Sequence, residues 1–103
     1  MPKKVENKKG KRFVIVRTYS AGVHAGELLS RQGKEVVLEN SIRIYYWKGA
    51  ASLSQMAMEG VKNPVDCKFA VPVSRIELTE AIEVIDCSPE AVKNIKAVPS
   101  WKI

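Results

Sequence analysis

The sequence predicts an α+β fold, in which a mostly antiparallel sheet of five to seven short strands packs with two short helices. Short runs rich in β-branched and aromatic residues alternate with turn residues along most of the chain, which is typical of strands. Two other segments begin with a serine and continue with apolar residues at helical spacing. The connections between these runs are short, which favours an antiparallel meander.

The first four strands follow directly on one another, and three more are expected after the first helix. Residues 23–30 are ambiguous, but Gly26 and the alternating polarity favour a strand that pairs back on the first. Pro72 cannot donate a hydrogen bond to a central ladder, so the strand that contains it is expected at an edge. The predicted strands are residues 13–19, 23–30, 35–38, 42–47, 68–73, 75–78 and 81–85.

Each predicted helix has a recognisable start. Ser52 with Gln55 three positions later forms a capping box, and Gly60 is placed to end that helix. Ser88 is the expected N-cap of the second helix, which is followed by a proline and an acid and runs to about Ala97. We expect this second helix to dock through Val92 and Ile95. Trp101 follows in a short tail, which we expect to pack on the body or on a neighbouring subunit.

The positive charge lies at the N-terminus rather than in the body. Residues 1–12 carry six Lys or Arg and one Glu, whereas residues 13–103 carry eleven Lys or Arg and ten acids. We therefore expect a flexible basic arm over residues 1–12 and a single domain over residues 13–103. A nearly neutral body lacks the clustered basic face of a duplex-binding protein, and binding of other nucleic acids stays open. A core this small favours a homo-oligomer.

The sequence lacks the residue types and spacings that most catalytic sites need. His24 is the one histidine, so no multi-histidine metal site is expected, and Cys67 and Cys87 do not have zinc-ligand spacing. The two cysteines are expected to be buried thiols, with a disulfide or a reactive thiol as the alternative. The prediction is a protein that is not an enzyme and has no cofactor. No apolar run is long enough to span a bilayer and no signal peptide is evident, so we expect no membrane contact and a cytoplasmic location.

The stretch RIYYWKG, residues 43–49, suggests a binding site. On a regular strand Tyr45 and Trp47 share a face on which a planar group could stack, with Arg43 beside them. The helix that starts at Ser52 presents unpaired N–H groups to an anion. If the first and fourth strands are neighbours, Arg17 lies across the same pocket. The candidate ligand-binding residues are Arg17, Tyr19, His24, Arg43, Tyr45, Trp47, Lys48, Ser52 and Ser54.

Ordinary structural explanations of these residues stay open. Aromatic residues in a strand often pack in the core, and the capping box fully explains Ser52. Arg17 and Arg43 could pair with acids across strands. Two other functions also remain. One is inhibition of a host enzyme through an exposed strand edge at residues 68–73 and the basic arm, and the other is binding of single-stranded nucleic acid through the same aromatic residues.

The blocks VRTYSAGVHAG and YYWKGAASLSQ, within residues 13–102, resemble a family of small tailed-bacteriophage proteins. The resemblance implies a phage origin and expression in a host bacterial cytoplasm, and by itself it supplies no activity. The chain is also similar in size and class to phage anti-defence proteins of the Thoeris and anti-CBASS kinds. That analogy implies a homo-oligomer that sequesters a small anionic nucleotide-like signal of host immunity without catalysis.

Overall fold

The computed structural model describes residues 12–103 and confirms the α+β fold. The predicted basic arm lies outside the described residues, apart from Arg12. The strands are β1 (Phe13–Thr18), β2 (Val23–Gln32), β3 (Glu35–Tyr46), β4 (Lys68–Phe69), β5 (Val73–Leu78) and β6 (Ala81–Asp86). The helices are α1 (Leu53–Glu59) and α2 (Pro89–Ala97), with a 3-10 turn at Pro64–Asp66 between α1 and β4.

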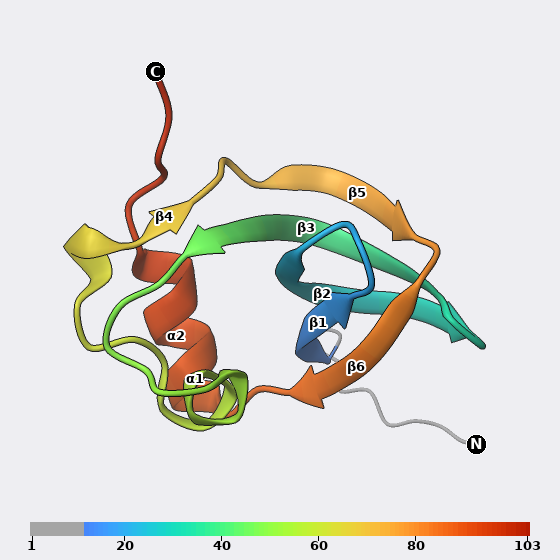
Figure 1. The fold of residues 1–103 in the computed structure, drawn as a ribbon, viewed down its shortest axis with the longest axis horizontal. Helices are drawn as coiled ribbons and strands as arrows, with labels where there is room; N and C mark the ends of the chain where they lie inside the picture. Colours follow the sequence, from blue (N-terminus) through green and yellow to red (C-terminus); the bar gives the residue numbers. More distant parts are fainter. Residues whose placement is uncertain (1–11) are drawn as a thin grey trace.

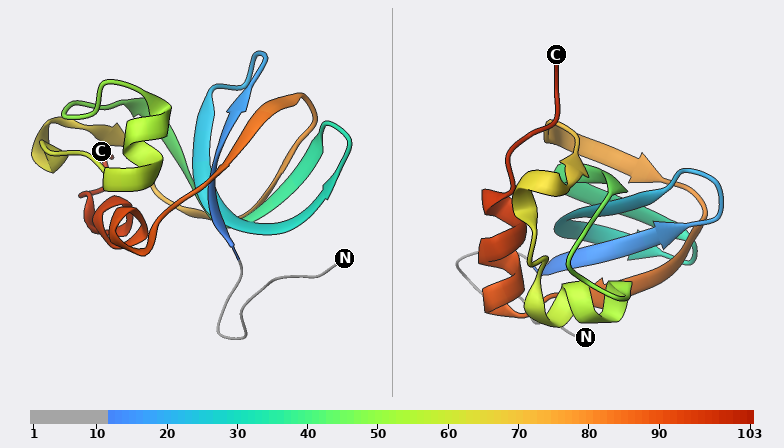
Figure 2. Two further views of the ribbon diagram at one scale, coloured as in Figure 1. Left: turned by 90° about the horizontal axis from the view of Figure 1, so that it is seen from below. Right: turned by 60° about the vertical axis from the view of Figure 1, so that its left-hand side comes forward.

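The sheet curls into a partly closed barrel (Figures 1 and 2). Its strand order is β4-β3-β2-β1-β6, with β5 paired to another stretch of β3, and every pairing is antiparallel. The first three strands therefore form the expected meander. Although β5 and β6 are joined by a short turn, they pair with opposite sides of the sheet, which brings its two edges round toward each other.

The prediction of separate strands at residues 35–38 and 42–47 was wrong, because β3 runs unbroken through both. Asn40 adopts φ 50°, in the left-handed region that asparagine tolerates, and the register with β2 shifts there. This bulge inserts one residue opposite Gly26, where an added Cβ would lie 3.0 Å from the Cα of Ser41. The extra residue reverses the side of the sheet that the even-numbered side chains of β3 face. They therefore pack in one core before the bulge and in the other core after it.

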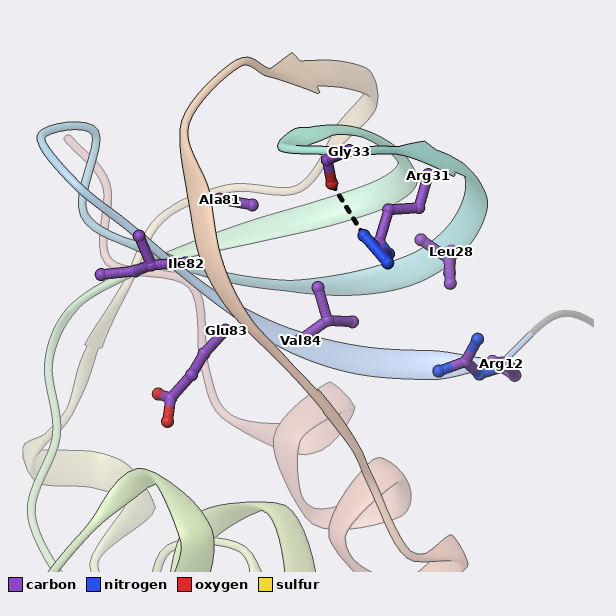
Figure 3. A pocket seen from close by; sticks show the side chains of 8 residues that line it. All are labelled: Arg12, Leu28, Arg31, Gly33, Ala81, Ile82, Glu83 and Val84. Atoms are coloured by element: carbon purple, nitrogen blue, oxygen red, sulfur yellow. Dashed lines mark hydrogen bonds between the residues drawn. The ribbon is translucent and has the colours of Figure 1, made fainter.

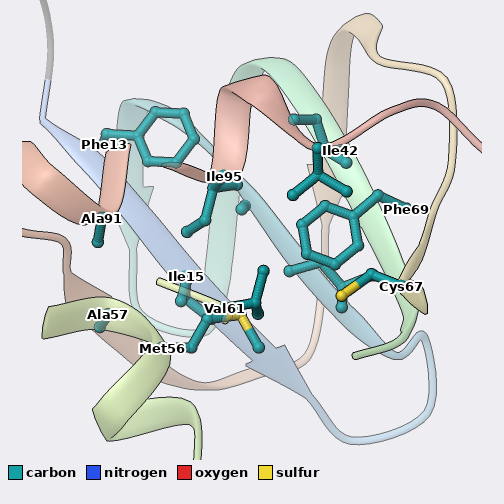
Figure 4. Close-up of a cluster of buried hydrophobic side chains, with 13 residues drawn as sticks. Phe13, Ile15, Ile42, Met56, Ala57, Val61, Cys67, Phe69, Ala91 and Ile95 are labelled. Carbon is teal, nitrogen blue, oxygen red and sulfur yellow. The ribbon is translucent and has the colours of Figure 1, made fainter. Parts of the chain in front are cut away.

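Two apolar cores lie on opposite faces of the sheet. The first lies between the sheet and the two helices (Figure 4), and the second lies inside the curl. Strand β1 is buried on both faces and contributes to both cores: Phe13 and Ile15 face the helices, while Val14 and Val16 face the interior of the curl. Strand β3 also contributes to both cores, but by position along the strand: Leu38, before the bulge, lies in the second core, and Ile42 and Ile44, after the bulge, lie in the first.

The predicted N-caps of both helices are confirmed, but the capping box is incomplete, because the Gln55 Oε1 accepts from the Ala51 N–H at 2.8 Å rather than from that of Ser52. The Ser52 hydroxyl accepts from the Gln55 N–H at 3.1 Å, and the Ser88 hydroxyl accepts from the Ala91 N–H at 3.1 Å. Helix α2 docks through Ala91 and Ile95, whereas Val92 is only half-buried. This differs from the expected pair by one position.

The side chain of Asn94 joins the two helices. Its Oδ1 accepts from the N–H of Val61 at 2.8 Å, and its Nδ2 donates to the carbonyl of the same residue at 2.9 Å. An added Cβ on Gly60 would overlap the Asn94 Oδ1, so Gly60 is required both for the close approach and for its φ of 78°.

The predicted edge strand at residues 68–73 was too long. Strand β4 covers only Lys68–Phe69, and Pro72 lies in the link to β5. The tail covers this part of the sheet, because the Trp101 N–H donates to the Phe69 carbonyl at 2.8 Å and Ser100 forms a parallel bridge to Phe69. The expectation that the tail packs on the body is therefore confirmed.

Candidate functional site

A pocket of about 320 Å³ opens on the concave face of the sheet, near the link from β4 to β5. Polar side chains from β2 and β3 form one wall, and small apolar side chains from the link and β5 form the other. The lining residues are His24, Ser41, Arg43, Tyr45, Ala70, Val71, Val73 and Ile76. The volume is at the lower end of the range for small-molecule sites.

The strand register explains why these side chains meet. His24 of β2 lies directly opposite Arg43 of β3. Beyond the bulge, Ser41, Arg43 and Tyr45 alternate with residues of the first core, so all three face the concave side. The link is held over them because the Ala70 N–H donates to the Arg43 carbonyl at 2.9 Å.

His24 is a neutral, buried ring at this site. Only 1% of its surface is exposed, and Nε2 lies 2.9 Å from the Ala21 carbonyl, so Nε2 carries the proton that is donated. Burial lowers the pKa of His24, and the Arg43 guanidinium lowers it further, against the opposing effect of the hydrogen bond to Ala21. The neutral ring therefore has Nδ1 as a hydrogen-bond acceptor.

Ser41 is the unusual group in the pocket. It is 1% exposed, and its Oγ has no hydrogen-bond partner in the described part of the chain. An unsatisfied buried hydroxyl costs about 1–3 kcal/mol. A hydroxyl on a pocket wall that has no hydrogen-bond partner within residues 12–103 is available to hydrogen-bond a ligand.

Arg43 and Tyr45 add a cation and a flat ring. Within residues 12–103 Arg43 forms no salt bridge. Tyr45 is 58% exposed and packs edge-on against Trp101, with ring centroids 5.4 Å apart at 74°. The Lys68 ammonium lies 5.2 Å from the centre of the Trp101 ring. The rim of the pocket is therefore aromatic and positively charged.

Three of the predicted site residues, His24, Arg43 and Tyr45, lie together in this pocket. Arg17 does not join them, because β2 separates β1 from β3, and the condition on which its placement in the pocket depended is not met. Arg17 instead pairs with Glu83 at 3.0 Å.

Trp47 does not share a face with Tyr45. Strand β3 ends at Tyr46, and its register with β4 shifts after Ile44, so Trp47 turns onto the first core. There it is half-buried and its Nε1 donates to the Ala50 carbonyl at 3.2 Å. The aromatic partner of Tyr45 is Trp101, which sequence spacing could not indicate.

The remaining predicted residues lie apart from the pocket lining. Tyr19 is 78% exposed in the turn between β1 and β2. Ser52 is occupied as the cap of α1, which has only seven residues. Lys48 and Ser54 are exposed, and the Lys48 N–H points to the Cys67 sulfur at 3.4 Å.

The prediction of buried thiols is confirmed for Cys67 but not fully for Cys87. Cys67 is buried and Cys87 half-buried, and neither forms a disulfide. Burial, with a smaller effect of Asp86, raises the pKa of Cys87 to about 12. No cluster of three or more metal-ligating side chains occurs within residues 12–103. Neither described helix has the length and apolar character needed to cross a bilayer.

A family model described as a domain of unknown function, DUF6948, matches residues 11–95. The chain belongs to the DUF6948 family. The DUF6948 match includes all four polar residues of the pocket and stops before Trp101. No curated protein and no solved structure matches the chain.

Proposed function

We propose that this DUF6948 protein binds a small anionic ligand with a planar part in the pocket of β2 and β3, without changing it chemically. The observation that carries the proposal is the buried, unpartnered hydroxyl of Ser41 on the wall of a cavity that also contains Arg43. Arg43 would pair with the anionic group, and Ser41 would hydrogen-bond it. The Tyr45 ring would pack on the planar part.

The arrangement of His24 supports binding rather than catalysis. Its Nε2 is occupied by the Ala21 carbonyl, and the Ser41 hydroxyl has no hydrogen bond to the ring. A serine nucleophile needs a base within hydrogen-bond reach. Nδ1 of the neutral ring would instead accept a hydrogen bond from an N–H or O–H group of the ligand.

A nucleotide-like molecule is the ligand class that we propose, since it combines a planar ring with an anion. Sequestration of such a signal by a phage protein is the corresponding biological role, and it is proposed from the analogy in size and class to phage anti-defence proteins.

Mass spectrometry of the supernatant from the heat-denatured protein tests the proposal. We expect a small anionic compound with an aromatic ring, released in proportion to protein. Calorimetry with that compound should show binding at least about tenfold weaker to Arg43→Gln, because a charge-assisted hydrogen bond is lost.

Arg17→Gln is the matched control, since it removes the same charge from a strand arginine that pairs with Glu83 outside the pocket. Equal affinity of the Arg43 and Arg17 variants would show that the pocket is not the site.

A further inference from the structure

Strand β6 has one side that no other described strand pairs with. Its ladder is formed with β1, and the Cys87 N–H donates to the Phe13 carbonyl at 3.0 Å. In an antiparallel pair the main-chain groups alternate in direction, so Glu83 and Ile85, like Cys87, bond to β1, whereas past the register shift the Ala81 N–H points the other way, to the Lys34 carbonyl. The N–H and C=O groups of Val84 and Asp86 therefore point to the open side.

A hollow of about 510 Å³ lies beside this open side, between β6 and the far end of β2 (Figure 3). It is lined by Arg12, Leu28, Arg31, Gly33, Ala81, Ile82, Glu83 and Val84. Leu28, Ala81 and Val84 are partly buried against the second core and give the hollow an apolar base. A hydrogen bond of 3.0 Å from the Ala81 N–H to the Lys34 carbonyl joins β6 to the hairpin of β2 and β3.

Three charged side chains, Arg12, Arg31 and Glu83, line the hollow. The Arg31 Nη1 donates to the Gly33 carbonyl at 2.7 Å, which holds the guanidinium toward the hollow (Figure 3). No described carboxylate forms a salt bridge with Arg31. Arg12 is paired with Asp86 at 2.7 Å, and the Glu83 side chain points away toward Arg17.

We propose that the open side of β6 and this hollow bind an extended acidic peptide segment of a partner protein by strand addition. The main chain of the peptide satisfies the free groups of Val84 and Asp86, an acidic side chain pairs with Arg31, and an apolar side chain packs on Leu28. A small molecule would contact the hollow without forming a ladder along the strand edge. This surface is separate from the pocket that contains Ser41.

The other edge, on β5, is less suited to strand addition. Pro72 precedes it, and a proline beside a strand discourages strand pairing. Strand β6 contains neither lysine nor proline.

Two occupants from this chain itself fit less well. A second copy that added its own β6 would bring carboxylates that are already paired with Arg12 and Arg17, so they would not be available to pair with Arg31. Residues 1–11 carry five lysines and one glutamate, which is the wrong sign of charge for Arg31.

The test uses the full chain and a capped heptapeptide of alternating Glu and Val, with a Lys-for-Glu version as its control. On addition of the acidic peptide, we expect hydrogen exchange at the Val84 and Asp86 amides to slow, while the amides already bonded to β1 change little. Arg31→Glu should weaken binding of the acidic peptide about tenfold. Arg75→Glu should leave it unchanged, because Arg75 lies on β5.

Three results would overturn the proposal. The first is equal affinity of the acidic peptide for Arg31→Glu and the unaltered chain. The second is protection of Val84 and Asp86 that rises with protein concentration and without peptide, which would identify a second copy as the occupant. The third is loss of protection at these amides when residues 1–11 are removed from the peptide-free protein, which would identify the N-terminal segment as the occupant.

Discussion

At the scale of single residues, the pocket contains two buried polar side chains with opposite hydrogen-bond status. His24 has a partner for one nitrogen and is kept neutral by its surroundings, whereas Ser41 has no partner in the described chain. Each condition has a measurable effect on stability, because a buried polar group without a hydrogen-bond partner destabilises the folded state, whereas a hydrogen-bonded one does not.

The lowered pKa of His24 makes stability depend on pH. Below about pH 6.5 the unfolded chain binds a proton at His24 that the folded chain does not, so the free energy of unfolding falls as the pH falls from that value toward the lower folded pKa. Urea denaturation at several pH values measures this. His24→Gln removes the only histidine of the chain and should flatten the curve between pH 7 and 5.5. An unchanged slope in that variant would contradict the assignment.

Ser41→Ala should stabilise the protein and impair binding at once. The substitution removes an unsatisfied buried hydroxyl, so we expect the free energy of unfolding to rise by about 1 kcal/mol. The same change removes a hydrogen-bond group from the proposed site. Urea denaturation and calorimetry with the released compound measure the two effects. A destabilised variant with full affinity would refute both expectations. Ser74→Ala, an exposed serine on β5, is the control.

At the scale of elements, the bulge in β3 decides where the pocket can form. Without the extra residue at Asn40, the side chains that follow it would exchange faces, and the polar wall of the pocket would be directed at the helices. The conformation of one residue thus positions three functional side chains.

Substitutions at Asn40 test this. Asn40→Val places a β-branched side chain at φ 50°, and we expect a loss of about 1–2 kcal/mol in the free energy of unfolding. Asn40→Gly should be nearly neutral, since glycine adopts this conformation freely. Both are measured by urea denaturation. If Val and Gly are equally tolerated in solution, the residue does not have the left-handed conformation.

The elements also show what the sequence could predict. Helix starts depend on neighbouring residues, so Ser52 and Ser88 were identified correctly as caps. The gap between the two predicted strands included Asn40, where β3 has a bulge and no break. A bulge and a turn use the same residue types, so β3 was wrongly divided in two.

The site was predictable only where it depends on alternation along one strand. Arg43 and Tyr45 follow from the spacing of β3, and they do line the pocket. Arg17 was misplaced because the order of strands in a sheet is a non-local property. Ser41 lies between the two strands predicted at residues 35–38 and 42–47, so it was assigned to neither, and Trp101 reaches Tyr45 only through the path of the tail.

At the scale of the whole molecule, β1 connects the two cores, since alternate residues of this strand are buried in each. Loss of packing in either core should therefore unfold the domain in a single transition. Leu38→Ala in the second core and Ile95→Ala in the first should each cost about 2–5 kcal/mol. Circular dichroism and tryptophan fluorescence should give coincident urea transitions for both variants. Separate transitions for Leu38→Ala would show that the cores unfold independently.

The edge-on contact of Trp101 with Tyr45 places an indole at the lip of the pocket, whereas Trp47 is held against the first core by its hydrogen bond to Ala50. The intrinsic fluorescence of the protein therefore reports on the pocket: a compound that binds against Tyr45 should change the emission of Trp101 and leave that of Trp47 as an internal reference. Compounds can therefore be screened without an attached dye, and Trp101→Phe, which should not respond to binding, is the control.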